Sequence, residues 1–133
     1  MKKLLIIAMF VLPLMVVGQV NNYRAFHATI GVWDENREEW NWNNPKDINI
    51  GIVTNIADRS YVIYAKKIIV LNIITIEQIK ETANTVSYLF ETLDQDGVYV
   101  VVTETIPKIK GYAYIITLIY PDFGIRYEVE TLK

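Results

Sequence analysis

The chain is dominated by short segments rich in valine, isoleucine, threonine and tyrosine, and this pattern limits the fold more than any other feature. These residue types favour pleated, half-buried strands. The segments recur about every 10 to 14 residues with turn residues between them, as in an all-β domain. In Ile125–Thr131, apolar and polar residues alternate without a break, which is typical of a strand with one buried face. The sequence therefore predicts an antiparallel β-structure.

Most of the chain divides directly into strands and turns. The predicted strands are Tyr23–Asp34, Arg37–Trp42, Asp47–Thr54, Ser60–Ala65, Lys66–Ile74, Val98–Glu104, Tyr112–Tyr120 and Ile125–Thr131. Lys66–Ile74 is either a separate strand or the bent second half of the strand before it. Tyr112–Tyr120 is apolar on both faces, so it belongs inside a sheet or in the wall of a barrel.

The segment Thr75–Leu93 fits two descriptions. Its apolar residues recur at steps of three and four, and a capping box stands at its start, which favours an amphipathic helix. Its second half has the composition of a strand and runs into Asp94–Gly97, a turn typical of hairpins. We expect a short helix or loop at Thr75–Ala83 and a strand at Asn84–Leu93. One helix over Thr75–Asp94 is the alternative.

Six to eight antiparallel strands in sequence order build either a closed up-and-down barrel or a two-sheet sandwich. Closure favours the barrel, because an open apolar sheet edge invites pairing with other chains. The predicted fold is thus a small all-β, barrel-like or sandwich domain, with a short helix near residues 75–83 as its only helical element.

The N-terminus has the three parts of a secretory signal peptide. Lys2 and Lys3 precede an apolar run, Leu4–Val17, and small or apolar residues stand before Gln19. The run is about 14 residues long, shorter than the roughly 20 needed for a membrane-spanning helix. We expect residues 1–18 to be a cleaved signal and residues 19–133 to be a single β domain with no stable membrane span. A retained N-terminal anchor is the alternative.

Composition narrows the class of protein further. Removal of the two signal lysines from 13 basic residues leaves 11, against 15 acidic residues, a formal charge of about −4. A nucleic-acid-binding face would be basic, so we expect no nucleic acid as a partner. The chain has no cysteine, so an exported domain of this sequence depends on its apolar core and not on disulfides.

Gly31-Val32-Trp33 in the first predicted strand and Arg126 in the last one resemble the sparse fingerprint of the lipocalin-like (calycin) barrels. That resemblance implies that Trp33 closes one end of a barrel and that Arg126 stacks on it. The overall pattern is also similar to that of small exported β-proteins of unknown function from bacteria and their phages. The shared features are a signal ending before glutamine, a W-x-W hairpin, an I-x-I strand, a D-x-D-G turn and a tyrosine-rich last strand.

The stretch 38–44 is the strongest candidate for a binding site. In a regular strand, Glu38, Trp40 and Trp42 would share one face. Exposed indoles beside carboxylates and amides bind sugars or protein partners. The alternative is that both indoles fill the core at a barrel end.

The other candidates have simpler explanations. His27, the only histidine, lacks a serine in a nucleophile-elbow context, and we expect it on the surface. Asp94–Gly97 resembles part of a calcium loop, but Thr105 occupies the position of the essential glutamate, so a turn is expected and no metal site. The close carboxylate pairs, Glu38/Glu39 and Glu128/Glu130 among them, are typical of a solvated face.

The sequence therefore predicts a binding or interaction module, not an enzyme, that acts in the periplasm or outside the cell, for instance as an inhibitor or accessory protein. Its partner would be a protein, a small ligand or a glycan, and no cofactor is expected. The alternatives are a secreted hydrolase that uses surface carboxylates and a barrel that carries a small ligand. Four carboxylates test the hydrolase by whether they share a cleft: Glu38, Glu39, Asp94 and Asp122.

Overall fold

Nine antiparallel strands make up the part of the chain that the computed structural model describes, residues 20–110 and 113–132. They are β1 (Val20–Asp34), β2 (Glu39–Trp42), β3 (Lys46–Asn55), β4 (Ser60–Tyr64), β5 (Ile68–Glu81), β6 (Thr85–Asp94), β7 (Tyr99–Pro107), β8 (Tyr114–Ile119) and β9 (Phe123–Leu132). These residues form no helix, and so none that could cross a membrane. The expected signal peptide, residues 1–18, lies outside the described ranges.

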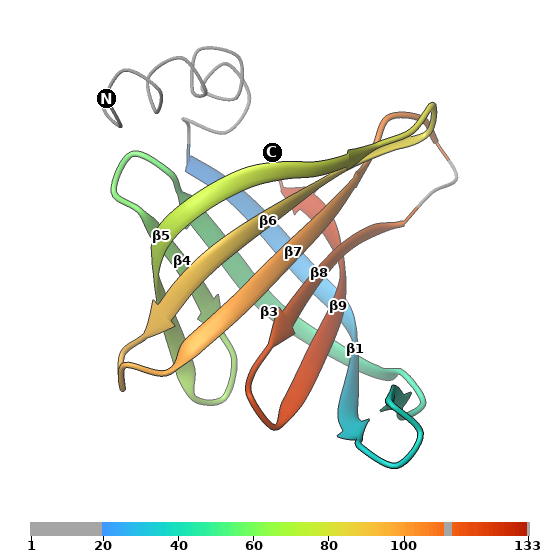
Figure 1. Ribbon diagram of the computed structural model, residues 1–133. Coiled ribbons are helices and arrows are strands. Elements are labelled where there is room, and N and C mark those ends of the chain that lie inside the picture. The colour runs from blue at the N-terminus through green and yellow to red at the C-terminus, as the bar shows by residue number, and fades with distance from the viewer. Residues whose placement is uncertain (1–19, 111–112, 133) are drawn as a thin grey trace.

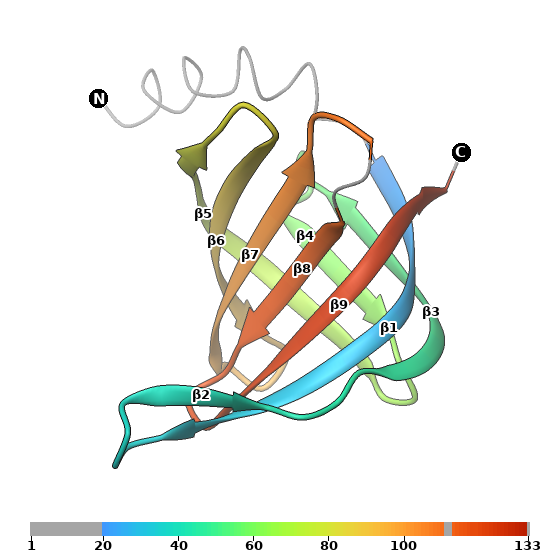
Figure 2. The same cartoon turned by 90° about the vertical axis from the view of Figure 1, so that its right-hand side faces the viewer.

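Eight of the strands close into an up-and-down barrel, which confirms the barrel and not the sandwich (Figure 1). Each of β3 to β9 pairs with its neighbour in the chain, and β9 pairs with β1. The first part of β1, Val20–Ala28, pairs with β3, whereas its last four residues pair with β2. Because β2 has no other partner strand, the β1–β2 hairpin extends past the end of the barrel (Figure 2).

The prediction of a short helix near residues 75–83 was wrong, and so was the alternative prediction of one longer helix. Residues 68–81 form one strand, β5, which pairs with β6 as far as Glu81 and Val86. The register shifts between Ile73 and Thr75, and again between Gln78 and Lys80. Each shift is a β-bulge, which inserts one extra residue into the strand.

The bulges explain the misleading sequence pattern. Ile73 and Phe90 are buried in the core, and Ile76 packs against it as the partner of Phe90. The extra residue, Ile74, is 44 % exposed, and so the step between the two inward isoleucines is three and not two. The predicted helical segment begins with a similar step of three, from Ile76 to Ile79. Ile79 is the extra residue of the second bulge and is 48 % exposed, so this spacing also belongs to a strand. The strand predicted at 84–93 is confirmed by β6.

Apolar side chains that alternate along the strands fill the barrel. The buried core includes Ala25, Ile52, Ile63, Leu71, Ile73, Phe90, Val100, Val102, Ile116, Leu118 and Val129. Because eight strands enclose a space just wide enough for side chains, this set forms a packed interior and not an open channel.

One carboxyl group lies within this core. Glu104 is 4 % exposed, and its Oε2 accepts a hydrogen bond of 2.6 Å from the Tyr61 hydroxyl. The Tyr114 hydroxyl lies 3.1 Å from Oε1 and 2.8 Å from the hydroxyl of Tyr23. The carboxyl group and the three hydroxyls therefore form a continuous hydrogen-bonded chain. Burial raises the pKa of Glu104, although the bonds from Tyr61 and Tyr114 partly oppose this effect.

Candidate functional site

Residues 31–42, the end of β1 with β2 and the turn between them, carry all three tryptophans of the chain. We call this segment the tryptophan hairpin. Trp33 pairs with Trp40 across the two strands, and Gly31 pairs with Trp42, so the three indoles lie on one face. The ring centroids of Trp33 and Trp40 are 5.7 Å apart in an edge-to-face contact. Those of Trp40 and Trp42 are 5.6 Å apart and stacked.

The turn of the hairpin is held by its own side chains. The Oδ1 atom of Asp34 accepts hydrogen bonds from the backbone amides of Asn36 and Arg37. Its Oδ2 atom accepts a bond from the side-chain amide of Asn41 in the opposite strand. Glu38 completes the turn with a φ of 53°, in the left-handed region that few non-glycine residues adopt. The turn therefore fixes the register that brings the indoles together.

Trp42 attaches the hairpin to the outer wall of the barrel. Gly31 and Gly124 are paired residues of β1 and β9, and the indole of Trp42 lies against both. A Cβ atom at Gly31 would lie only 2.5 Å from Cε3 of Trp42, and one at Gly124 would lie 3.2 Å from Cη2. The guanidinium group of Arg126 covers the indole at 4.1 Å from the ring centroid, a cation–π contact. Without side chains on the two glycines, the backbone provides a flat surface for Trp42.

The residues predicted for binding thus come together, with two differences in detail. Trp40 and Trp42 share a face and are half-buried, but Glu38 lies in the turn before β2 and is outside the regular alternation. Arg126 stacks on Trp42, where the calycin-like pattern implied Trp33. Trp33 is 40 % exposed and lies one residue beyond Val32, the last residue of β1 that pairs with β9. None of the three indoles belongs to the core cluster.

The four carboxylates of the hydrolase alternative do not share a cleft. Glu38 and Glu39 lie in the tryptophan hairpin, whereas Asp122 lies between β8 and β9. Asp94 is the last residue of β6 and is the only one of these four that lines the pocket at the barrel mouth. Two carboxylates that act on one bond lie about 5 to 9.5 Å apart across it, and here the four groups are divided among three hairpins, β1–β2, β6–β7 and β8–β9.

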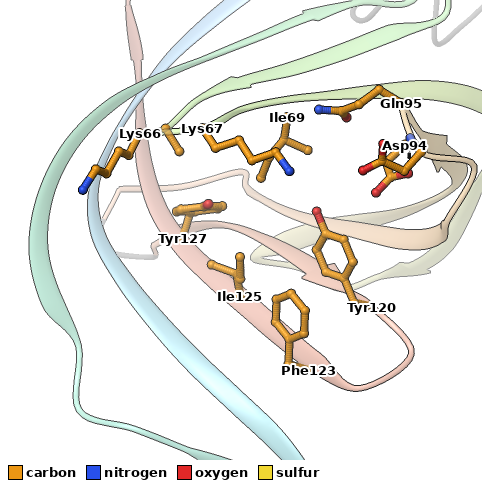
Figure 3. A pocket seen from close by; sticks show the side chains of 11 residues that line it. Lys66, Lys67, Ile69, Asp94, Gln95, Tyr120, Phe123, Ile125 and Tyr127 are labelled. Atoms are coloured by element: carbon orange, nitrogen blue, oxygen red, sulfur yellow. Dashed lines mark hydrogen bonds between the residues drawn. The ribbon is translucent and has the colours of Figure 1, made fainter.

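The barrel-mouth pocket is a cavity of about 360 Å³. Figure 3 shows the side chains that line it. It lies at the end of the barrel where the β4–β5, β6–β7 and β8–β9 turns are found, and the hairpin extends from the same end (Figure 2). Among the residues that line it are Lys66, Lys67, Asp94, Tyr120, Phe123 and Tyr127. Its volume is within the range of small-molecule sites in proteins, at the lower end.

Asp94–Gly97 forms the turn that was expected. The Oδ1 atom of Asp94 accepts 2.8 Å hydrogen bonds from the amides of Asp96 and Val98, and Gly97 adopts a φ of 81°. Gln95 has a role that the sequence did not indicate. Its side-chain amide bonds to the carbonyl of Ile68 and to the amide of Val70, and so continues the β5 ladder where β6 has ended.

His27 lies on the outer surface between two acidic side chains. Its Nε2 atom is 3.1 Å from Oδ1 of Asp47, and its Nδ1 atom is 3.4 Å from Oε1 of Glu128. The two serines lie on other strands, Ser60 in β4 and Ser87 in β6, and neither forms a hydrogen bond with His27. This arrangement is that of a polar contact network on the outer surface.

Sequence reasoning missed Glu104 and the barrel-mouth pocket. Alternation could have found Glu104, because Val100, Val102 and Glu104 share one strand face and the two valines are strongly apolar. The pocket left no local signal, since its walls come from three turns distant in sequence.

A search of protein-family models, of curated proteins and of solved structures found no match to this chain.

Proposed function

We propose that this protein is an exported, non-catalytic binding module and that the tryptophan hairpin recognises a partner protein outside the cytoplasm. The observation that carries the proposal is the position of the three indoles. They gather on one face of a hairpin that extends past the barrel, and they contribute nothing to the barrel core. Burial of large apolar side chains in the core would stabilise a small domain. A cluster of them on the protein surface therefore indicates an interaction site.

The composition of the site supports a protein partner. Tryptophan and arginine are the residues most enriched at the energetic centres of protein interfaces. Here Arg126 covers one face of Trp42, and Trp40 stacks beside it, so the indoles form a cluster and not separate flat platforms. A sugar ring stacks on a free indole face, and the cluster leaves fewer such faces. A buried apolar cluster within an interface fits this shape better.

The anchoring of Trp42 supports a preorganised site. An isolated two-stranded hairpin is marginally stable in water. Contact of Trp42 with Gly31, Gly124 and Arg126 restricts the hairpin before any partner arrives. Binding then costs less conformational entropy, which raises affinity.

The proposal is tested by capture from an envelope extract of the producing cells, followed by titration of the purified partner. Trp33→Ala removes the most exposed indole and leaves Trp42 in place. Tyr64→Ala removes another exposed aromatic side chain, on β4 and away from the hairpin, and is the matched control. We expect Trp33→Ala to weaken binding by about 2 kcal/mol or more, as for an interface anchor, and Tyr64→Ala to have no effect.

All three tryptophans lie in the hairpin, so the indole fluorescence of the whole chain reports on this site alone. A partner that binds there changes the fluorescence, and a partner that binds elsewhere does not. Equal capture by the parent and Trp33→Ala would contradict the proposal. A different result would point to a glycan in place of a protein partner. In that case no protein is captured, the parent binds a purified cell-wall polysaccharide, and Trp33→Ala loses that binding.

A further inference from the structure

The barrel-mouth pocket has an apolar and aromatic side. Phe123, Ile125 and Ile69 line it, and the rings of Tyr120 and Phe123 are stacked with centroids 4.5 Å apart and an angle of 7° between planes. Figure 3 shows these two rings beside Ile125 and Tyr127. Such a wall favours a flat or compact apolar group on the ligand.

The pocket also carries positive charge that no described residue neutralises. Lys66 and Lys67 lie in the turn between β4 and β5, and neither forms an ion pair or a hydrogen bond with another described side chain. Figure 3 shows the Lys67 side chain extended across the pocket. An extended, unpaired ammonium group in a pocket with an aromatic wall is suited to bind a carboxylate.

Negative charge lies across the pocket from the lysines. Asp94 and Asp96 line it from the turn between β6 and β7. Oδ1 of Asp94 is occupied by two backbone amides, whereas Oδ2 has no partner among the described residues. No described ion pair joins Lys67 and Asp94, so no nitrogen–oxygen distance between them is 4.0 Å or less. The two opposite charges therefore face the same cavity without neutralising each other.

A further hydroxyl group opens into the pocket. Tyr127 is 3 % exposed, and no described residue forms a hydrogen bond with its hydroxyl. No buried side-chain nitrogen or oxygen among the described residues lacks a partner. The Tyr127 hydroxyl must therefore reach solvent, and Figure 3 shows it in the pocket. It can donate to a carboxylate or accept from an ammonium group.

From this arrangement we infer that the barrel-mouth pocket binds a small zwitterion with an apolar body, of the class of the aromatic α-amino acids. Lys67 binds the carboxylate, Asp94 binds the ammonium group, and the ring packs on Phe123 and Ile125. A ligand with only a negative charge would be repelled by Asp94 and Asp96, and a ligand with only a positive charge would be repelled by the lysines. A ligand with both charges satisfies both sides. This inference concerns a site separate from the tryptophan hairpin and does not depend on the proposed protein partner.

Three ligands with the same phenylethyl group test it by isothermal titration calorimetry: phenylalanine, phenylpropanoate, which lacks the ammonium group, and phenethylamine, which lacks the carboxylate. Phenylalanine should bind the parent protein about three- to tenfold more tightly than either of the others. Lys67→Met keeps the apolar stem of the side chain. It should weaken the binding of phenylalanine and of phenylpropanoate by a similar factor. It should leave phenethylamine unchanged.

Asp94→Asn keeps the Oδ1 acceptor of the turn and removes the charge. This variant should weaken the binding of phenylalanine and of phenethylamine and leave the affinity for phenylpropanoate unchanged. Lys80→Met changes an exposed lysine of β5 that does not line the pocket, and it should affect none of the three ligands. Trp33→Ala should also leave all three affinities unchanged, which separates this site from the hairpin.

The opposite dependence of the two single-charge ligands on Lys67 and Asp94 is the decisive result, because a general loss of folding would weaken all ligands alike. Absence of binding by phenylalanine, equal affinity for the three ligands, or binding of phenylpropanoate alone would overturn the inference.

Discussion

Replacement of Glu104 by glutamine should make the protein more stable at neutral and alkaline pH and remove a pH dependence from its unfolding. The reason is the position of the carboxyl group in the barrel core. Burial raises the pKa of Glu104 above its value in the unfolded chain, so the folded state holds the proton more tightly. Stability from this proton is fully present below the unfolded-state pKa and is lost as the pH rises through the folded-state pKa.

The hydrogen-bond geometry sets the size of the effect. Glutamine has nearly the same shape as glutamate, so its carbonyl oxygen can still accept from Tyr61 and its amide can donate to the Tyr114 hydroxyl. Tyr114 can then donate to Tyr23, and every group keeps a partner. The variant therefore avoids the cost of a buried charge without creating an unsatisfied group. We expect it to gain about 1–3 kcal/mol in unfolding free energy above the folded-state pKa of Glu104.

Urea unfolding followed by circular dichroism, over a series of pH values, measures this difference. The stability curves of the parent and Glu104→Gln should diverge as the pH rises, with the variant the more stable. Tyr61→Phe is the control, because it removes the 2.6 Å donor to Oε2 and should cost about 1–3 kcal/mol. Parallel pH curves, or a variant that is less stable at every pH, would refute the reasoning.

Three further outcomes test the description of the hairpin and the turns. Gly31→Ala places a Cβ atom 2.5 Å from Trp42 and should displace that indole. We expect a shift in indole fluorescence and a loss of about 1–3 kcal/mol in unfolding free energy, measured by thermal unfolding. Unchanged fluorescence would contradict the packing of Trp42 on Gly31. Trp42→Ala should lower the unfolding free energy by about 1–3 kcal/mol, whereas Trp33→Ala should change it by about 0.5 kcal/mol or less; equal losses would show that the indoles have equal structural roles. Gln95→Ala removes two hydrogen bonds to β5 and should speed amide hydrogen exchange at Val70 without a change at the opposite end of the strand.

The sequence predicted the strands well because most of them follow a period of two. Ile125–Thr131 lies within β9, and the strand predicted at 84–93 differs from β6 by one residue at each end. The exception was β5, where the bulges at Ile74 and Ile79 change the spacing of the inward side chains. Periodicity assumes one residue per step of the strand, and a bulge breaks that assumption without any change in composition.

The candidate site was predictable to the extent that it is local. Trp40 and Trp42 are two residues apart, so alternation alone put them on one face. The partner of Arg126 was not predictable, because it depends on which residue of β1 pairs with Gly124 of β9. That register is set by the closure of the whole barrel. The barrel-mouth pocket depends in the same way on three turns that closure brings together.

The first four residues of β9 contribute to both proposed sites, and alternation explains how. Phe123 and Ile125 face the barrel mouth and line the pocket. Gly124 and Arg126, which alternate with them, face outward. Gly124 lies under the indole of Trp42, and Arg126 covers that indole. Because successive side chains of a strand point to opposite faces, one short segment can hold two different surfaces. A substitution of Arg126 should therefore weaken the hairpin alone. A substitution of Gly124 that pushes β9 away from Trp42 would disturb both sites, because the backbone of this segment is common to them.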